Sequence, residues 1–194
     1  MKIKNLECYE TLLIVVDMVN GFVRKGDLHD PKIADVVPRQ IELIKEVNKN
    51  NGLIVFIKDT HTTNSTEHKR FNGLVHCIKG SGEEEVIDEL KEYEKESIAI
   101  EKNSTSFMEA PAFRKLIDQA KNIKKVDVVG CCTDICDFNG TMGLANYFDE
   151  WNIDVEIRVH KDAIATFAEA SRQKYVDAAY LLMEQQGIQL VKKR

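Results

Sequence analysis

The 194-residue sequence predicts an α/β fold, a doubly wound and mostly parallel six-stranded sheet with helices on both faces in a Rossmann-like three-layer arrangement. Short apolar runs alternate along the chain with longer amphipathic segments, as in parallel strands that are joined by helices. No repeat, low-complexity tract or Pro/Gly/Ser-rich linker interrupts this alternation. We therefore expect a single domain over residues 1–194.

Periodicity locates the expected elements in order. The apolar runs that predict strands are residues 11–16, 53–57, 97–100, 126–129, 155–159 and 188–191. The segments that predict helices are residues 33–47, 84–93, 112–120, 135–151 and 169–186. In the second of these helices, Val86, Ile87 and Leu90 mark an apolar face. The irregular stretch of residues 59–82 is longer than most loops, so we expect it to be functional.

Composition excludes several classes of protein. The net charge is −5 and no basic tract is present, which argues against nucleic acid as a partner. No apolar stretch is long enough for a membrane span or a signal peptide. The five cysteines are an odd number, and three of them fall within six residues, so a disulfide framework is not expected. We expect a reduced, cytoplasmic protein with no membrane partner.

Chemically distinctive residues stand at the carboxyl ends of the expected strands. Asp17 follows the first strand, Asp59 the second and Lys102 the third. The fourth strand leads to Cys136. Because ligands of doubly wound sheets bind beyond these strand ends, we expect a carboxylate, an ammonium and a thiol to meet at one rim.

Cys136 is the candidate nucleophile of this rim. Gly130 ends the strand before it, and the helix that follows places Cys136 in its first turn, where N–H groups and the helix dipole favour a thiolate. Asp17 would take the thiol proton, and Lys102 would hold the anions and lower the pKa of the thiol. The alternative is that Cys136 is a small buried apolar residue, Asp17 a turn residue and Lys102 a solvated lysine.

Asp59, His61 and His76 form a candidate metal site in the long irregular stretch. Imidazole and carboxylate together suit Zn²⁺, Fe²⁺ or Mn²⁺, and Glu67 lies between the histidines as a fourth donor. We expect the neighbouring His68 to be exposed. The alternative explanation of this pattern is a solvated loop.

A thiolate-rich metal set is a second hypothesis. Its donors would be Cys131, Cys132 and Cys136, with His76 or Cys77. The spacing lacks the paired C-x-x-C of structural zinc sites and of redox motifs, so we rank it below the first set.

Four ordered segments resemble the isochorismatase-like cysteine hydrolases, and within them the nicotinamidases. They are residues 13–22, residues 59–61 with 76–80, residues 100–107 and residues 129–136. Residues 162–166 resemble a later turn of the family. The resemblance covers nearly the whole chain, and the four motifs together make it specific.

The resemblance implies a role for each matching residue. Cys136 would be the nucleophile, Asp17 the base and Lys102 the third member of the catalytic set. The residues that match the metal ligands are Asp59, His61, His76 and, with a longer spacing, the extra carboxylate Glu67.

The resemblance also implies a backbone feature and a pocket residue. The family has a cis peptide bond just before the Thr-Asp pair, which here would join Cys131 and Cys132. It would turn the N–H of Cys132 toward an oxyanion hole shared with Cys136. Phe22 matches an aromatic residue that lines the substrate pocket.

The chain departs from the family pattern at three places. Gly21 stands where an acid is common, and Asp137 follows the nucleophile where an apolar residue is usual. The charge of Asp137 is expected to oppose thiolate formation. Residues 69–75 lack the usual Trp/Pro-rich approach to the metal histidine.

Residues and resemblance together predict an amide hydrolase, a nicotinamidase that forms nicotinate and ammonia through a thioester. The expected cofactor is one divalent metal ion, Zn²⁺ ahead of Fe²⁺ or Mn²⁺. The expected partners are a small-molecule amide and, as the resemblance implies, further copies of the chain. The alternatives are a relative that hydrolyses a carbamoyl or ureido compound, a non-catalytic metal- or thiol-binding protein on the same fold, and a redox sensor with a Cys132–Cys136 disulfide.

Overall fold

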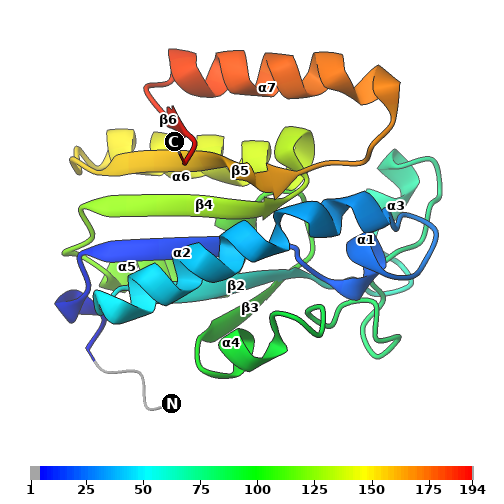
Figure 1. The fold of residues 1–194 in the computed structure, drawn as a ribbon, viewed down its shortest axis with the longest axis horizontal. Helices are drawn as coiled ribbons and strands as arrows, with labels where there is room; N and C mark the ends of the chain where they lie inside the picture. The colour runs from blue at the N-terminus through cyan, green and yellow to red at the C-terminus, as the bar shows by residue number, and fades with distance from the viewer. Residues whose placement is uncertain (1–4, 194) are drawn as a thin grey trace.

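The six expected strands form one parallel sheet in the computed structural model, which describes residues 5–193 (Figure 1). They are β1 (Thr11–Val16), β2 (Leu53–Asp59), β3 (Ile98–Lys102), β4 (Lys125–Cys131), β5 (Glu156–Ala165) and β6 (Gln189–Val191). Their order across the sheet is β3-β2-β1-β4-β5-β6, and neighbouring strands are parallel. The predicted fold class is confirmed.

Helices cover the sheet on two sides. They are α1 (Asn20–Val23), α2 (Val37–Lys49), α3 (Thr66–Arg70), α4 (Lys91–Lys95), α5 (Pro111–Gln119), α6 (Phe138–Glu150) and α7 (Gln173–Gln185). Figure 1 shows α2 in front of the sheet and α5 and α6 behind it, with α7 along the β6 edge. Two apolar clusters fill the space between these layers and the sheet.

The central strand β1 shows why these residues form a sheet. Its last five residues, LLIVV, are all buried, because helices lie on both faces of the sheet. Leu12, Ile14 and Val16 pack into the cluster that includes α5 and α6. Leu13 and Val15 pack into the cluster that includes α2. Each such side chain contributes roughly 1.5–3 kcal/mol on burial, so β1 anchors both layers.

The helix that was expected over residues 84–93 is mostly absent, and this prediction is wrong. Within the described chain only Lys91–Lys95 is helical there. The reason is local, because Glu83 and Glu84 turn back and accept hydrogen bonds from amides of the preceding loop, including that of Cys77 at 2.8 Å. Val86 instead forms an antiparallel bridge with Val19. The apolar residues that suggested a helix are buried, but the chain that carries them is a single bridge followed by a turn.

Other boundaries differ from the prediction by a few residues. The second half of the expected helix over residues 33–47 is α2, and a 3₁₀ turn over Pro31–Val36 precedes it. The last helix likewise begins at Gln173, after a 3₁₀ turn over Ala170–Arg172. Strand β5 extends to Ala165, well beyond the expected residue 159.

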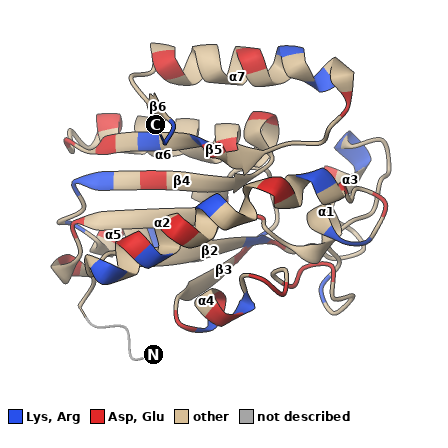
Figure 2. Cartoon of the chain, in the orientation of Figure 1, with Lys and Arg blue, Asp and Glu red and all other residues tan. Residues whose placement is uncertain are grey.

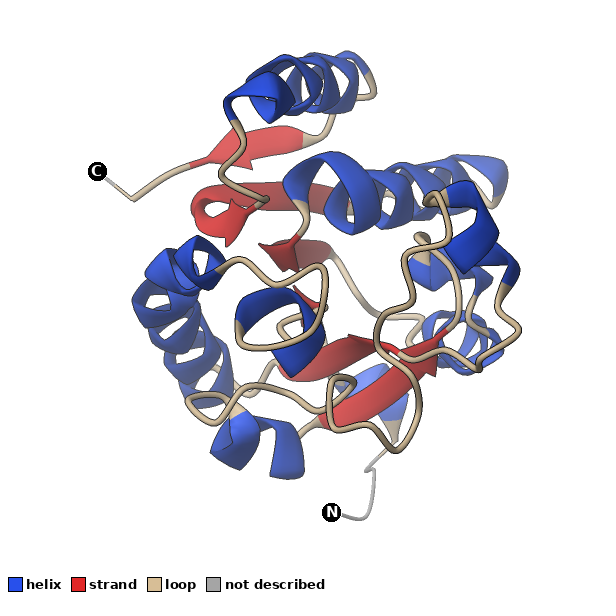
Figure 3. Ribbon diagram, turned by 90° about the vertical axis from the view of Figure 1, so that its right-hand side faces the viewer, coloured by secondary structure: helices blue, strands red, loops and turns tan. Residues whose placement is uncertain are grey.

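The strand order creates a switch point between β1 and β4. These strands are neighbours in the sheet although more than a hundred residues separate them, and the chain leaves them on opposite sides. Ligands of such sheets bind in the crevice at this point, beyond the carboxyl ends of the strands. Figure 3 looks onto that end of the molecule, where loops and short helices cross the strand ends.

Charged residues of both signs are spread over the ribbon of residues 5–193. Figure 2 shows Lys and Arg interspersed with Asp and Glu along α2 and along α7. Among residues 5–193, no helix combines the length and the apolar character that crossing a bilayer requires.

Candidate active site and metal centre

Three residues from separate strand ends meet at the switch point. Lys102, the last residue of β3, places Nζ 2.8 Å from Asp17 Oδ2 and 3.6 Å from Cys136 Sγ. Asp17 follows β1 directly, and Cys136 follows β4 by five residues. All three side chains are buried. The sequence therefore predicted correctly that these three residues converge, and their chemical roles remain proposals.

The chain that carries Cys136 is a π-helical turn, Thr133–Asp137, which leads into α6. The peptide bond between Cys131 and Cys132 is cis, at the position that the resemblance implied. Cys131 Sγ donates a hydrogen bond to the carbonyl oxygen of Asp17 at 3.1 Å. These contacts join the end of β4 to the end of β1.

Burial controls the protonation of the site. Burial raises the pKa of Asp17 to about 6, although Lys102 opposes the shift. Burial also raises the pKa of the Cys136 thiol well above its ordinary value, and Lys102 offsets only part of this effect. Lys102 lowers the pKa of the thiol in the expected direction, but burial outweighs this effect in the free protein. A carboxyl with a pKa near neutrality is suited to accept the thiol proton.

Asp137 also differs from its expected character. It was expected to oppose the thiolate with its charge, but its side chain is fully buried. Burial raises the pKa of Asp137 well above the ordinary value, and the nearby Asp17 and Asp134 add to the shift. Its surroundings therefore favour the uncharged carboxylic acid.

The candidate metal donors converge beside this group. Asp59 Oδ2 lies 2.9 Å from His61 Nε2 and 3.3 Å from His76 Nε2. Glu67 Oε1 lies 3.7 Å and 3.8 Å from the same two nitrogens. One ligand atom from each of the four residues falls within 4.8 Å of the others. The structure thus brings together all four residues of the predicted metal set.

Hydrogen bonds to the Nδ1 atoms of His61 and His76 leave both Nε2 atoms directed at Asp59 Oδ2. His61 Nδ1 is 2.7 Å from Asn103 Oδ1 and 3.1 Å from Ser65 Oγ. His76 Nδ1 is 3.1 Å from the carbonyl oxygen of Leu74. Such outer contacts fix the ring orientation of metal-binding histidines. The sequence analysis missed Asn103 and Ser65, although Asn103 directly follows Lys102 at a strand end.

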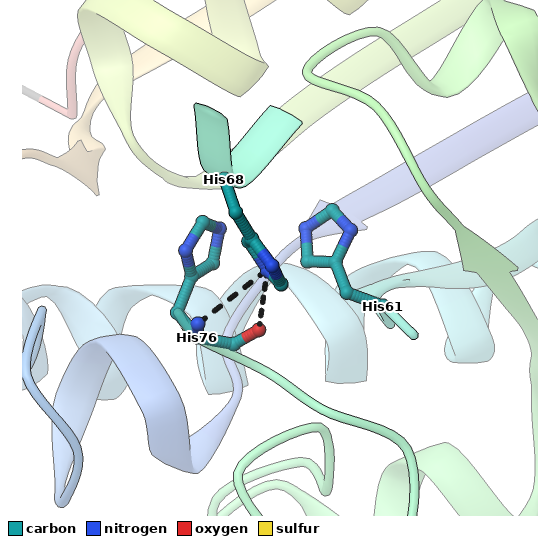
Figure 4. A group of neighbouring side chains, drawn as sticks. All are labelled: His61, His68 and His76. Atoms are coloured by element: carbon teal, nitrogen blue, oxygen red, sulfur yellow. Dashed lines mark hydrogen bonds between the residues drawn. The ribbon is translucent and has the colours of Figure 1, made fainter. Parts of the chain in front are cut away.

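His68 was expected to be exposed, and this prediction is wrong. It lies on the short helix α3 and is only 4% exposed. Figure 4 shows its ring beside the rings of His61 and His76. Its Nε2 is 3.2 Å from the carbonyl oxygen of His76, so the backbone engages that nitrogen. His61, His68 and His76 also offer ligand atoms within 4.8 Å of one another, which makes His68 a further donor beside the main set.

Asp59 belongs to both groups. Its Oδ1 lies 2.7 Å from Lys102 Nζ, while its Oδ2 faces the two histidines. Burial alone would raise the pKa of Asp59, but Lys102 and the hydrogen bonds from His61 and His76 hold it far below its usual range. One ionised carboxylate therefore links the candidate metal donors to the candidate catalytic group.

A cavity of about 440 Å³ opens onto both groups. The residues that line it include Cys132, Cys136, His76 and Glu67. Phe22, the predicted pocket residue, is part of the wall. The residues of this wall that the sequence analysis did not identify include Phe71, Leu74, Ile135, Phe167, Glu169 and Arg172. The alternative thiolate-rich metal set has no support in this geometry, since Lys102 and Asp17 surround Cys136.

The fold and the site together define a class, α/β proteins with a thiol, a carboxylate and an ammonium at the carboxyl edge of a parallel sheet. The family model of the isochorismatase domain matches residues 11–192. The chain therefore belongs to the isochorismatase family and is a hydrolase of that family.

The chain is also similar to one curated protein, nicotinamidase 1 from Arabidopsis thaliana. The two are 30% identical over an alignment of 141 residues, and the match covers 66% of this chain. The match covers 57% of that protein, so the chain spans little more than half of its length.

Solved structures share the fold at lower identity. The nicotinamidase from Bacillus subtilis has a TM-score of 0.75 and 23% identity, over 94% of this chain and 99% of that one. The pyrazinamidase of Pyrococcus horikoshii, solved in complex with zinc, has a TM-score of 0.73 and 22% identity, over 95% and 99%. N-carbamoylsarcosine amidase from Thermoplasma acidophilum has a TM-score of 0.73 and 24% identity, over 94% and 96%.

Proposed function

We propose that this protein is a metal-assisted cysteine amidohydrolase that converts nicotinamide and water to nicotinate and ammonia. The observation that carries the proposal is the position of Asp59, which joins the metal donors to the Lys102 group. A ring that binds at the donors would present its carboxamide to Cys136 within the same cavity. The similarity to the Arabidopsis nicotinamidase supports this choice of substrate.

The four donors fit a divalent cation. Two imidazoles and two carboxylates suit Zn²⁺, Fe²⁺ or Mn²⁺, and we favour Zn²⁺. Burial lowers the pKa of His76, but Asp59 and Glu67 outweigh that effect and raise it to about 10, so the set attracts positive charge. A bound ion held by Asp59, His61, Glu67 and His76 would supply a Lewis-acid contact for the pyridine nitrogen.

The first half of the proposed reaction forms a thioester. Asp17 accepts the Cys136 proton as the sulfur attacks the carboxamide carbon, so a thiol with a raised pKa need not ionise in advance. Lys102 holds Asp17 in place at 2.8 Å. The amides of Cys132 and Cys136 would receive the developing oxyanion. Asp17 then returns the proton to the nitrogen, the C–N bond breaks and ammonia leaves.

The second half hydrolyses the thioester. Asp17 takes a proton from water, which attacks the acyl carbon, and the C–S bond breaks. The sulfur recovers the proton from Asp17, and nicotinate is released. Phe22 lies with its ring centroid 5.7 Å from that of His76, so it would pack against the substrate ring during both steps.

Ammonia release from a panel of amides tests the proposal. We expect turnover of nicotinamide by protein supplied with Zn²⁺, Fe²⁺ or Mn²⁺, and loss of turnover after a chelator removes the metal. Cys136→Ala protein should bind the metal and release no ammonia. Hydrolysis of carbamoyl or ureido compounds but not of nicotinamide would contradict the proposed substrate. Ligand binding without any hydrolysis would contradict the proposal that the protein is an enzyme.

The assembly of the protein with further copies of itself is also a proposal, and it follows from the resemblance. Exposed apolar side chains on α7, among them Tyr175, Leu181 and Leu182, agree with it. Sedimentation equilibrium would measure the mass of the particle in solution. A mass equal to one chain at micromolar concentration would rule the assembly out.

A further inference from the structure

Asp137 is a buried acid that the proposed mechanism does not use. It ends the π-helical turn that carries Cys136 and is 0% exposed. Its backbone amide donates to the carbonyl oxygen of Cys132 at 3.2 Å, so the residue is fixed against the start of the turn. Among residues 5–193, no group forms a hydrogen bond with either of its carboxyl oxygens. A buried carboxylate is costly unless it is paired, so the geometry favours the uncharged acid.

Lys102, the cation that acts on Asp137, is already engaged with other carboxylates. Lys102 pairs with Asp17 and Asp59, at 2.8 and 2.7 Å. Asp134 lies in the same turn as Asp137, and its carboxylate pairs with Arg172 at 2.5 Å. An ionised Asp137 would therefore be a third carboxylate near the Lys102 ammonium, which already pairs with Asp17 and Asp59.

The remaining groups that face Asp137 add no positive charge. Tyr180 of α7 and Cys131 at the end of β4 are its other titratable neighbours, and both are neutral at physiological pH. One turn further along α6, the Thr141 hydroxyl is buried and has no hydrogen-bond partner within residues 5–193. None of these neighbours therefore carries a positive charge that would stabilise an ionised Asp137.

We propose that Asp137 is a positioning residue that serves as an uncharged carboxylic acid behind the nucleophile, and that its ionisation suppresses the reactivity of Cys136. As a neutral group it leaves the charge balance at the sulfur to Asp17, Asp59 and Lys102. As an anion next to Cys136 it disfavours both the thiolate and the oxyanion. This inference deepens the proposed hydrolase function, and its tests do not require turnover.

Unfolding by urea at a series of pH values tests the uncharged state. Asp137→Asn keeps the shape and cannot ionise, and Asp137→Val is a second neutral variant if the amide disturbs the turn. Asp149→Asn is the matched control, an exposed acid on α6. Relative to the Asn variant, the folding constant of the wild type should fall as the pH rises above the ordinary pKa of an aspartate, by up to about tenfold per pH unit, because unfolding then releases one proton.

Alkylation of Cys136 by iodoacetamide, followed by mass spectrometry, tests the second half of the proposal. At the pH where the unfolding series shows that Asp137 ionises, the wild type should react about tenfold more slowly than Asp137→Asn, and below that pH the two should react alike. Unfolding ratios that do not vary with pH, or alkylation profiles that superimpose throughout, would overturn the inference. A failure to hydrolyse nicotinamide would overturn the proposed substrate and leave both of these measurements decisive.

Discussion

Replacement of Lys102 by methionine tests the charge arrangement of the site most directly. The ammonium is buried, and its nitrogen lies 2.8 Å from Asp17 and 2.7 Å from Asp59, which are buried as well. Methionine fills a similar volume without a charge, so two carboxylates would lose their partner. Breaking a buried ion pair in this way costs about 3–5 kcal/mol. For a domain of this size we expect the Tm to fall by roughly 6–20 °C.

The matched control is Lys79→Met. Lys79 Nζ lies 2.6 Å from Glu101 Oε2, but both side chains are largely exposed, at 65% and 46%. Exposed pairs contribute about 0–1 kcal/mol, so this variant should unfold like the wild type.

Urea unfolding at pH 7 in the presence of a chelator measures both variants without a bound metal near Asp59. The loss in free energy of unfolding that Lys102→Met causes should become smaller on acidification, because protonation removes the charge on Asp17. A Lys102→Met protein within about 1 kcal/mol of the wild type would refute the reasoning, since that is the range of an exposed pair.

Three further outcomes follow from the contacts. Cys136→Ala should lose at least about a thousandfold in turnover with little change in stability, as expected for a nucleophile, and a modest loss would assign the thiol to packing. Burial alone would raise the pKa of Asp127, but His160 and Arg158 lower it, so Asp127 stabilises the fold above about pH 4 and loses this effect as the pH falls. Asp127→Asn should therefore show a flatter acid limb in pH-dependent unfolding. At Gly21 a Cβ would lie 2.6 Å from Cys77 Sγ, and Gly21→Ala should cost about 1–3 kcal/mol, which the double variant with Cys77→Ala recovers in part.

The fold was predictable because its signals are local and repeated. Each strand is a short apolar run and most connections contain a helix, so the alternation alone predicts a parallel sheet. The segment over residues 84–90 was not predictable in this way. Its apolar residues have helical spacing, but Glu83 accepts the amide hydrogen of Cys77 and Ile87 donates to the carbonyl of Met18. The first contact is local to the loop, whereas the second joins segments that are distant in the sequence, and residue spacing displays neither of them.

The meeting of the candidate site residues was predictable for a different reason. The carboxyl ends of neighbouring parallel strands lie at one edge, so Asp17, Lys102 and Cys136 follow from topology. The protonation of Cys136 was not predictable, because it depends on burial that outweighs the effect of Lys102. The burial of His68 was missed because a single helical turn inside a polar loop leaves little periodic signal.

The departure at Gly21 illustrates how a family position can change without loss of the site. A side chain at residue 21 would meet Cys77 Sγ and, at 3.2 Å, Glu83 Cβ. Cys77 directly follows the candidate metal donor His76, and its amide donates to Glu83 at 2.8 Å. An acid is therefore present beside the backbone of Gly21 and Cys77, but it is the side chain of Glu83 and not a side chain at residue 21. The absence of a side chain at Gly21 leaves room for that arrangement, which holds the backbone behind His76.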